Sequence, residues 1–231
     1  MDILSTPGFV LALMLALKLK PLAFSMIATV CSSWVFVSRS TTRRTAWQPL
    51  GDPNVKCVAA GNAMVSRMTL VVYLLEARAC VWLYEQPMTS LLWQHPRMQD
   101  LVRRVLVYQT QMWMGSYGAE SPKSTCLWSC CPCSSFSVPL PKDKTWISLV
   151  NKSAKSDGTI SVSGNSKLKG SQAYPAGFGH ATVDFWKNAP RVPKAGVAET
   201  PEVFKPGKKF DSWPDADLTE VLQYLACGNV S

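Results

Sequence analysis

Segments with helical periodicity alternate with short apolar runs along residues 8–113, and this alternation restricts the fold more than any other feature. The expected elements are a helix over 8–19, a strand over 22–30, a helix from Asn62 to about Ala79, a strand over 80–84, a helix that Ser90 opens and His95-Pro96 kinks or restarts, and a strand over 105–113. Helices that alternate with buried strands are typical of a parallel sheet covered by helices. The sequence therefore predicts an α/β fold.

Two reactive side chains follow directly after predicted strands. Cys31 comes after the apolar run 22–30, and Glu85 comes after the run 80–84. If these strands are parallel neighbours, both side chains lie at the carboxyl edge of the sheet, where open α/β sheets bind ligands. Adjacent strands are ~4.8 Å apart, so we expect Cys31 and Glu85 to lie within ~10 Å of each other.

Composition divides the chain into three parts. Residues 1–133 carry the predicted α/β core. Residues 134–171 are rich in Ser, Lys and Gly, and we expect a flexible insertion with low burial and few backbone hydrogen bonds. Residues 172–231 are expected to form a closing helix to about Lys187, a proline-rich strap and a terminal amphipathic helix over 215–226. The carboxyl-terminal part is thus predicted to be loop-rich.

The chain is basic, with 24 Lys and Arg against 15 Asp and Glu and a formal net charge of +9. Such a surface attracts nucleic acid, anionic lipid or an acidic partner. Arg39, Arg43 and Arg44 lie in a polar loop shortly after Cys31, where they are candidates for phosphate contacts. Charge alone does not choose between these partners.

The eight cysteines are irregularly spaced, and several lie inside apolar runs. We interpret them as reduced thiols, which predicts an intracellular protein of unknown compartment. A dense group follows residue 125 and consists of Cys126, Cys130, Cys131 and Cys133. Zinc usually takes ligand pairs from two places in the chain, and this group has no second pair or nearby histidine. We therefore predict no metal site, and interpret the group as strand-end thiols or sites of reversible lipidation.

The apolar stretch 9–37 is the candidate for a membrane segment. Lys18, Lys20 and Pro21 divide it into pieces that are each shorter than the ~20 residues needed to span a bilayer. No basic residue precedes it, which also argues against a secretory signal. A membrane-associated subunit anchored by residues 9–37 stays as the least favoured interpretation.

Several short motifs, in this order, resemble the carbon-5 DNA cytosine methyltransferases, in particular their compact phage-type branch. The motifs are Asp2-Ile-Leu-Ser-Thr-Pro-Gly8-Phe9, Val30-Cys31-Ser32-Ser33-Trp34, Glu85-Gln86-Pro87, Tyr117-Gly118 with Lys123-Ser-Thr-Cys-Leu-Trp128, and Tyr174-Pro-Ala-Gly177 to Trp186. Together they cover most of residues 1–130 and then 167–187. The arrangement also resembles a group of uncharacterised dinoflagellate proteins.

The resemblance implies a Rossmann-like, methyltransferase-type sheet and a set of site residues. Gly8 and Phe9 would bind S-adenosylmethionine. Cys31 would attack the pyrimidine ring as a thiolate, while Glu85 would hydrogen-bond the ring nitrogen of a base flipped out of DNA. Arg39, Arg43 and Arg44 would contact DNA or RNA phosphates.

The chain also departs from the pattern of this family. Val30 stands where the family has proline, and Gln86 stands where it has asparagine. The segment between Gly8 and Cys31 is short and has no acidic residue to bind a cofactor ribose, so the sheet is predicted to be amino-terminally truncated.

From these departures we expect a methyltransferase-like domain that is reduced or inactive and binds nucleic acid. If active, it would be an S-adenosylmethionine-dependent DNA cytosine methyltransferase. The alternative is a non-enzymatic structural or interaction protein that kept only the fold.

Overall fold

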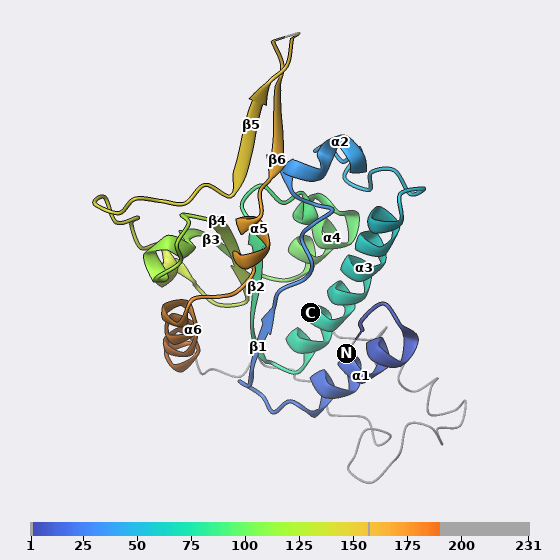
Figure 1. Cartoon of the computed structure of the whole chain (residues 1–231). Helices are drawn as coiled ribbons and strands as arrows, with labels where there is room; N and C mark the ends of the chain where they lie inside the picture. The colour runs from blue at the N-terminus through green and yellow to red at the C-terminus, as the bar shows by residue number, and fades with distance from the viewer. Residues whose placement is uncertain (1, 157, 190–231) are drawn as a thin grey trace.

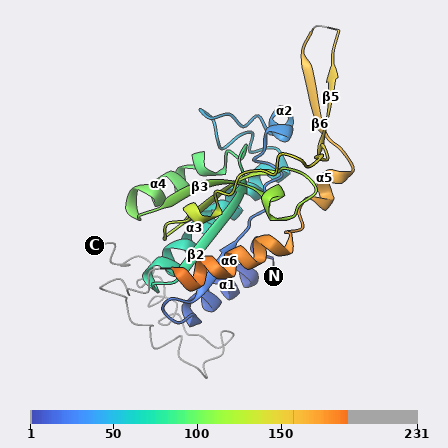
Figure 2. The same cartoon turned by 90° about the vertical axis from the view of Figure 1, so that its left-hand side faces the viewer.

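A four-stranded sheet with helices on both faces forms the centre of the protein (Figures 1 and 2). The computed structural model describes residues 2–156 and 158–189. On one face lie α1 (Thr6–Lys18), α3 (Lys56–Ala77) and α4 (Pro96–Arg104), and on the other lies α6 (Ala176–Asn188). The predicted α/β class is therefore confirmed.

The strands are ordered β1, β2, β4, β3 across the sheet. Their bounds are β1 Phe24–Ile27, β2 Val81–Pro87, β3 Tyr108–Trp113 and β4 Ser124–Ser129. β1 and β2 are parallel neighbours, as predicted, with Ile27 opposite Tyr84. β4 runs antiparallel to both β2 and β3, so the prediction of a wholly parallel sheet is wrong. The reason is the connection from β3 to β4, which consists of one short 3₁₀ helix (Met114–Tyr117) and a turn, whereas a parallel pair needs a long crossover.

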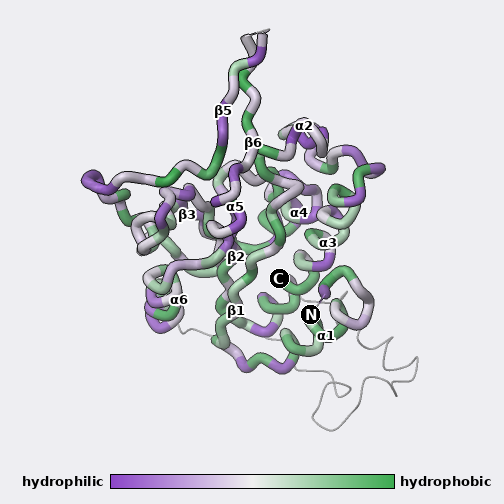
Figure 3. Tube along the Cα trace, in the orientation of Figure 1, coloured by the Kyte–Doolittle hydropathy of each residue, from purple (hydrophilic) through white to green (hydrophobic). Residues whose placement is uncertain are grey.

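Two apolar cores lie on the two faces of this sheet, and β2 contributes to both. Trp82 and Tyr84 are buried on the face covered by α1, α3 and α4, and Val81 and Leu83 are buried on the face covered by α6. Successive strand residues point to opposite faces, which is why one fully buried strand needs an unbroken apolar run. Figure 3 shows that α1 and α3 are largely hydrophobic along their lengths.

The first helix begins close to its predicted start. Ser5 is its N-cap, with the hydroxyl accepting a hydrogen bond from the Gly8 amide, and Pro7 lies in the first turn. Gly8 is needed for a close approach, because a Cβ atom there would lie 1.9 Å from the Asp2 carbonyl oxygen. The segment before α1 thus folds back over this glycine.

Replacing Gly8 with alanine is expected to lower the free energy of unfolding by about 1–3 kcal/mol, because the Asp2 backbone must move away from the new methyl group. Gly179→Ala on α6 is the matched control, since a Cβ there meets nothing within 4 Å. That change is expected to leave stability unchanged or to raise it by up to about 1 kcal/mol. Urea unfolding of both variants measures the difference, and equal effects would contradict this account of Gly8.

The predicted helix boundaries near Asn62 and Ser90 are wrong. α3 begins at Lys56, so Asn62 lies inside it, where its amide group donates to the Leu50 carbonyl instead of capping the helix. Ser90 is followed only by a 3₁₀ turn (Leu92–Gln94) before α4 begins. The expected restart at His95-Pro96 is confirmed, because α4 begins at Pro96 and His95 Nδ1 accepts a hydrogen bond from the Arg97 amide at 3.1 Å.

The predicted insertion contains more structure than its composition suggests. Its side chains are mostly exposed, as expected, but β5 (Val150–Ala154) and β6 (Ile160–Gly164) form a hairpin that extends away from the sheet (Figure 1). The expectation of few backbone hydrogen bonds is therefore wrong for these two strands. A 3₁₀ turn (Ser134–Phe136) and the single helical turn α5 (Lys167–Gly170) complete the segment. The proline-rich strap and the terminal helix over 215–226 lie outside the described residues.

The stretch 9–37 does not form one continuous helix. It contains most of α1, all of β1, and most of the 3₁₀ turn Phe36–Ser38 that precedes α2 (Arg39–Thr42). Among the described helices, α3 alone is long and apolar enough to cross a membrane by length and composition, and half of its apolar window is buried in the protein. A buried core helix meets the same criterion.

Candidate functional site

The carboxyl ends of β1 and β2 are joined by side-chain hydrogen bonds. The Gln86 amide nitrogen donates to the carbonyl oxygen of Thr29 at 2.8 Å and to its hydroxyl at 3.1 Å. The Ser90 hydroxyl in turn donates to the Gln86 amide oxygen at 3.0 Å, which fixes the orientation of that amide. Cys31 follows Thr29 by two residues, so these bonds hold the segment that carries its thiol against β2.

Glu85 lies within β2 itself instead of after it, and only 4% of its surface is exposed. The Tyr174 hydroxyl donates to Glu85 Oε2 at 2.6 Å, and Lys123 Nζ lies 3.7 Å from Oε1. Oε1 has no hydrogen-bond partner among the described residues. A buried carboxylate is costly without compensation, and here one cation and one hydroxyl provide it, while Oε1 is buried without a hydrogen bond from the described residues.

Lys123 and Tyr174 come from distant parts of the chain to reach Glu85. Lys123 directly precedes β4 with a φ angle of 31°, and its ammonium group also donates to the Ser171 carbonyl at 3.3 Å. The same ammonium lies 5.5 Å from the centre of the Tyr174 ring. Burial, followed by the negative charge of Glu85, raises the pKa of Tyr174, so its phenol remains a hydrogen-bond donor.

Cys31 shares this edge with Glu85, as the adjacency of the two strands predicted. Burial raises the pKa of Cys31, the charge of Glu85 raises it further, and Lys123 partly opposes both effects. The thiol is therefore protonated at neutral pH. The chemistry of a thiolate nucleophile would require this pKa to fall, and its role as the nucleophile stays a prediction.

The two predicted cofactor residues lie elsewhere, at the start of α1. There Arg67, from the middle of α3, donates to the carbonyl groups of Ile3 and Ser5. The Gly8 and Phe9 amides both donate to Ser5, and the Asp2 carbonyl fills the space over Gly8. These residues therefore do not fit S-adenosylmethionine, because neither a free amide nor an open face remains for it.

The three predicted phosphate-binding arginines have different surroundings. Arg44 is 1% exposed, and its guanidinium group lies 3.4 Å from the centre of the Trp34 ring. It cannot reach a phosphate on the surface, and this part of the prediction is corrected. Arg43 is exposed and lies 3.6 Å from Asp52, while Arg39 is half-buried and donates to the Thr89 carbonyl at 3.3 Å.

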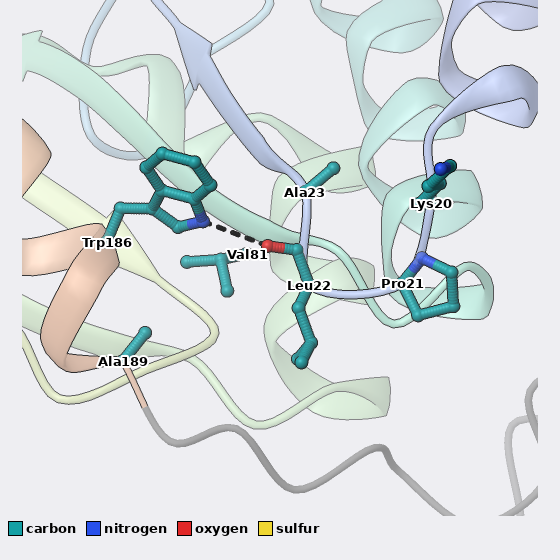
Figure 4. Close-up of a pocket in the computed structure, with 7 residues that line it drawn as sticks. All are labelled: Lys20, Pro21, Leu22, Ala23, Val81, Trp186 and Ala189. Atoms are coloured by element: carbon teal, nitrogen blue, oxygen red, sulfur yellow. Dashed lines mark hydrogen bonds between the residues drawn. The ribbon is translucent and has the colours of Figure 1, made fainter.

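A separate cavity of about 460 Å³ lies near the start of β1, at the end of that strand away from Cys31 (Figure 4). Its lining includes Lys20, Leu22, Val81 and Trp186, and the Trp186 indole donates to the Leu22 carbonyl at 2.9 Å. None of the predicted site residues lines it. In residues 2–156 and 158–189, no group of three or more His, Cys, Asp or Glu side chains is placed to hold a metal ion.

Lys123 and Tyr174 lie in two of the sequence motifs but were not predicted as site residues. These two motifs follow the Cys31 and Glu85 motifs in order, and that order is the sequence signal that would have indicated them. No protein-family model, curated protein or solved structure matches this chain. Its function is therefore inferred from the side chains around Glu85 and from its sequence motifs.

Proposed function

We propose that the chain is a reduced methyltransferase-like domain that binds an unpaired pyrimidine nucleotide of DNA or RNA without transferring a methyl group to it. The observation that carries the proposal is the placement of Cys31 beside the buried carboxylate of Glu85 at the ends of two parallel strands. The Rossmann-like, methyltransferase-type character of the sheet is part of the same proposal.

Oε1 of Glu85, which accepts no hydrogen bond from the described residues, suits the exocyclic amino group of cytosine, because carboxylates accept hydrogen bonds from that group. The carboxylate is buried beside Tyr174 and Lys123, so a base would reach it only when removed from its stack and after one of these two side chains moves aside. The same amino group distinguishes cytosine from uracil and thymine, which have a carbonyl at that position.

Exposed lysines around the hairpin supply the charge for the phosphate backbone. They are Lys142, Lys144, Lys152, Lys155, Lys167 and Lys169. The turn Phe36–Ser38, which directly precedes α2 and Arg39, packs beside β6 (Figure 1). The hairpin and Arg39 thus lie on the same side of the protein. We expect nucleic-acid binding there to weaken steeply as the salt concentration rises.

Two features argue against methyl transfer by this chain. The Cys31 thiol is protonated at neutral pH, and the residues predicted to hold the methyl donor are closed by the protein's own backbone. A donor that is not held near the base does not react at a useful rate, even where a nucleophile is present.

Glu85→Gln is expected to weaken binding of a short cytosine-containing single strand about 10-fold, because a charge-assisted hydrogen bond becomes a neutral one. Fluorescence polarisation with a labelled oligonucleotide measures the change. The matched control is Glu120→Gln, which alters an exposed carboxylate outside β2 and is expected to leave binding unchanged.

Equal affinity of Glu85→Gln and the unmodified chain for the oligonucleotide would reject the proposed binding site. Transfer of a radiolabelled methyl group to DNA that disappears in Cys31→Ser would reject the second half of the proposal and restore an active enzyme.

A further inference from the structure

Cys130 and Cys131 form a pair of adjacent thiols at the end of β2 opposite to Glu85. Their sulfur atoms are 3.8 Å apart. The Ser129 hydroxyl donates to the Trp82 carbonyl at 2.6 Å and accepts from the Cys131 amide at 3.2 Å, and the Trp82 amide donates to Cys130 Sγ at 3.4 Å. The start of β2 therefore holds both residues in place before any ligand binds.

We propose that Cys130 and Cys131 are a binding site for a trivalent arsenical, which would bridge the two sulfur atoms through one arsenic atom. Trivalent arsenic is pyramidal, and its lone pair narrows the sulfur–arsenic–sulfur angle to roughly 100°, so two bonds of ~2.3 Å, the length of a zinc–thiolate bond, span ~3.5 Å. The sulfur atoms are 3.8 Å apart, so they need to approach each other only slightly. A single thiophilic atom can thus bind both thiols with little movement of the backbone.

A direct disulfide between these residues is the competing product, and its geometry is unfavourable. The Cα atoms of consecutive residues are ~3.8 Å apart across a trans peptide bond. Disulfides usually require ~4.4–6.8 Å between Cα atoms. Closing the bond would strain the backbone, whereas a bridging atom lengthens the ring and removes that constraint.

Zinc is a poorer ligand for this pair than trivalent arsenic. Structural zinc takes four protein ligands, and no group of three candidate ligands is placed together in the described part of the chain. The hydrogen bond with Cys131, together with burial, also raises the pKa of Cys130, and zinc binds thiolates.

An arsenic oxide instead condenses with neutral thiols. Two arsenic–sulfur bonds form, the arsenic–oxygen bonds break, and the oxygen leaves as water with both thiol protons while arsenic stays trivalent.

The test is titration of the full chain with phenylarsine oxide, read by intact mass. We expect one arsenical per chain, released by ethanedithiol, with affinity reduced about 100-fold in Cys130→Ser and in Cys131→Ser because the second bond is lost. Cys57→Ser removes an exposed thiol and is expected to change nothing. A mass decrease of two hydrogens without arsenic would show a disulfide instead and overturn the proposal.

A second measurement does not depend on how the variants fold. In the unmodified chain, bound phenylarsine oxide is expected to protect Cys130 and Cys131 from iodoacetamide added after unfolding in urea, whereas Cys57 is alkylated. Protection of Cys131 and Cys133 without Cys130 would place the arsenical on a different pair and reject this site.

Discussion

Lowering the pH from 7 to 4 is expected to remove about 3 kcal/mol of folding free energy through His95 alone. Burial, followed by the charges of Arg44 and Arg97, lowers the pKa of His95 from 6.5 to about 4. A depressed pKa means that the unfolded chain binds the proton more tightly. The stabilisation is therefore complete above pH 6.5 and is lost as the pH falls toward 4, at 1.36 kcal/mol for each pKa unit.

The geometry at His95 explains why a proton is unfavourable there. Its Nδ1 accepts the hydrogen bond from the Arg97 amide, which a protonated nitrogen cannot do. The ring also packs edge-on against Trp34, with 5.9 Å between ring centres, so water is excluded.

His95→Asn separates this titration from that of the acidic residues. Asparagine caps helices well but does not titrate, so the variant is expected to lose about 3 kcal/mol less than the unmodified chain between pH 7 and 4. Urea unfolding at several pH values gives both curves. Parallel curves for the two proteins would contradict the assigned role of His95.

Arg44→Met is expected to lower the free energy of unfolding by about 4 kcal/mol at neutral pH. The guanidinium group of Arg44 donates to the Pro49 carbonyl, the Asn62 side-chain oxygen, the Val58 carbonyl and the Ser33 hydroxyl. Methionine fills a similar volume but leaves these acceptors without a donor, and each buried unsatisfied group costs about 1–3 kcal/mol. Attraction between the cation and the Trp34 ring is lost as well.

The neighbouring arginine provides the control for this substitution. The side chain of Arg43 is 75% exposed, so Arg43→Met is expected to change stability by less than about 0.5 kcal/mol. Arg44→Lys keeps the charge but not the planar fork of donors, and its stability should lie between the other two variants. Equal unfolding midpoints for Arg43→Met and Arg44→Met in urea would show that burial of Arg44 contributes nothing.

The features predicted correctly are those encoded by neighbouring residues. The first helix, within the apolar run 8–19, and the helical restart at His95-Pro96 follow from local patterns. The parallel pairing of β1 with β2 follows from the helix α3 between them, which is typical of a parallel crossover. The antiparallel placement of β4 was missed because pairing partners are not written in a strand's own sequence. A strand buried on both faces has a continuous apolar sequence, and that pattern does not indicate whether the strand is parallel or antiparallel to its neighbours.

The site was predicted only in part, because local patterns identify strand ends but not contacts between distant segments. Cys31 and Glu85 were found because strand ends can be read from the chain. Arg44 looks like its exposed neighbour Arg43 in sequence, and only the packing of α3 against the loop shows that it is buried. Tyr174 reaches Glu85 from the far side of the insertion, a contact that no local pattern indicates.

The position of β4 between β2 and β3 also sets an order in which the sheet can assemble. β3 and β4 pair across a short connection, with Trp113 opposite Ser124, whereas β1 must find β2 across all of α2 and α3, with Phe24 opposite Val81. Closing the shorter loop loses less chain entropy, so the β3–β4 hairpin is the natural starting point and β1 joins last. Residues 29–31 would then reach their place beside Glu85 only in the final steps of folding.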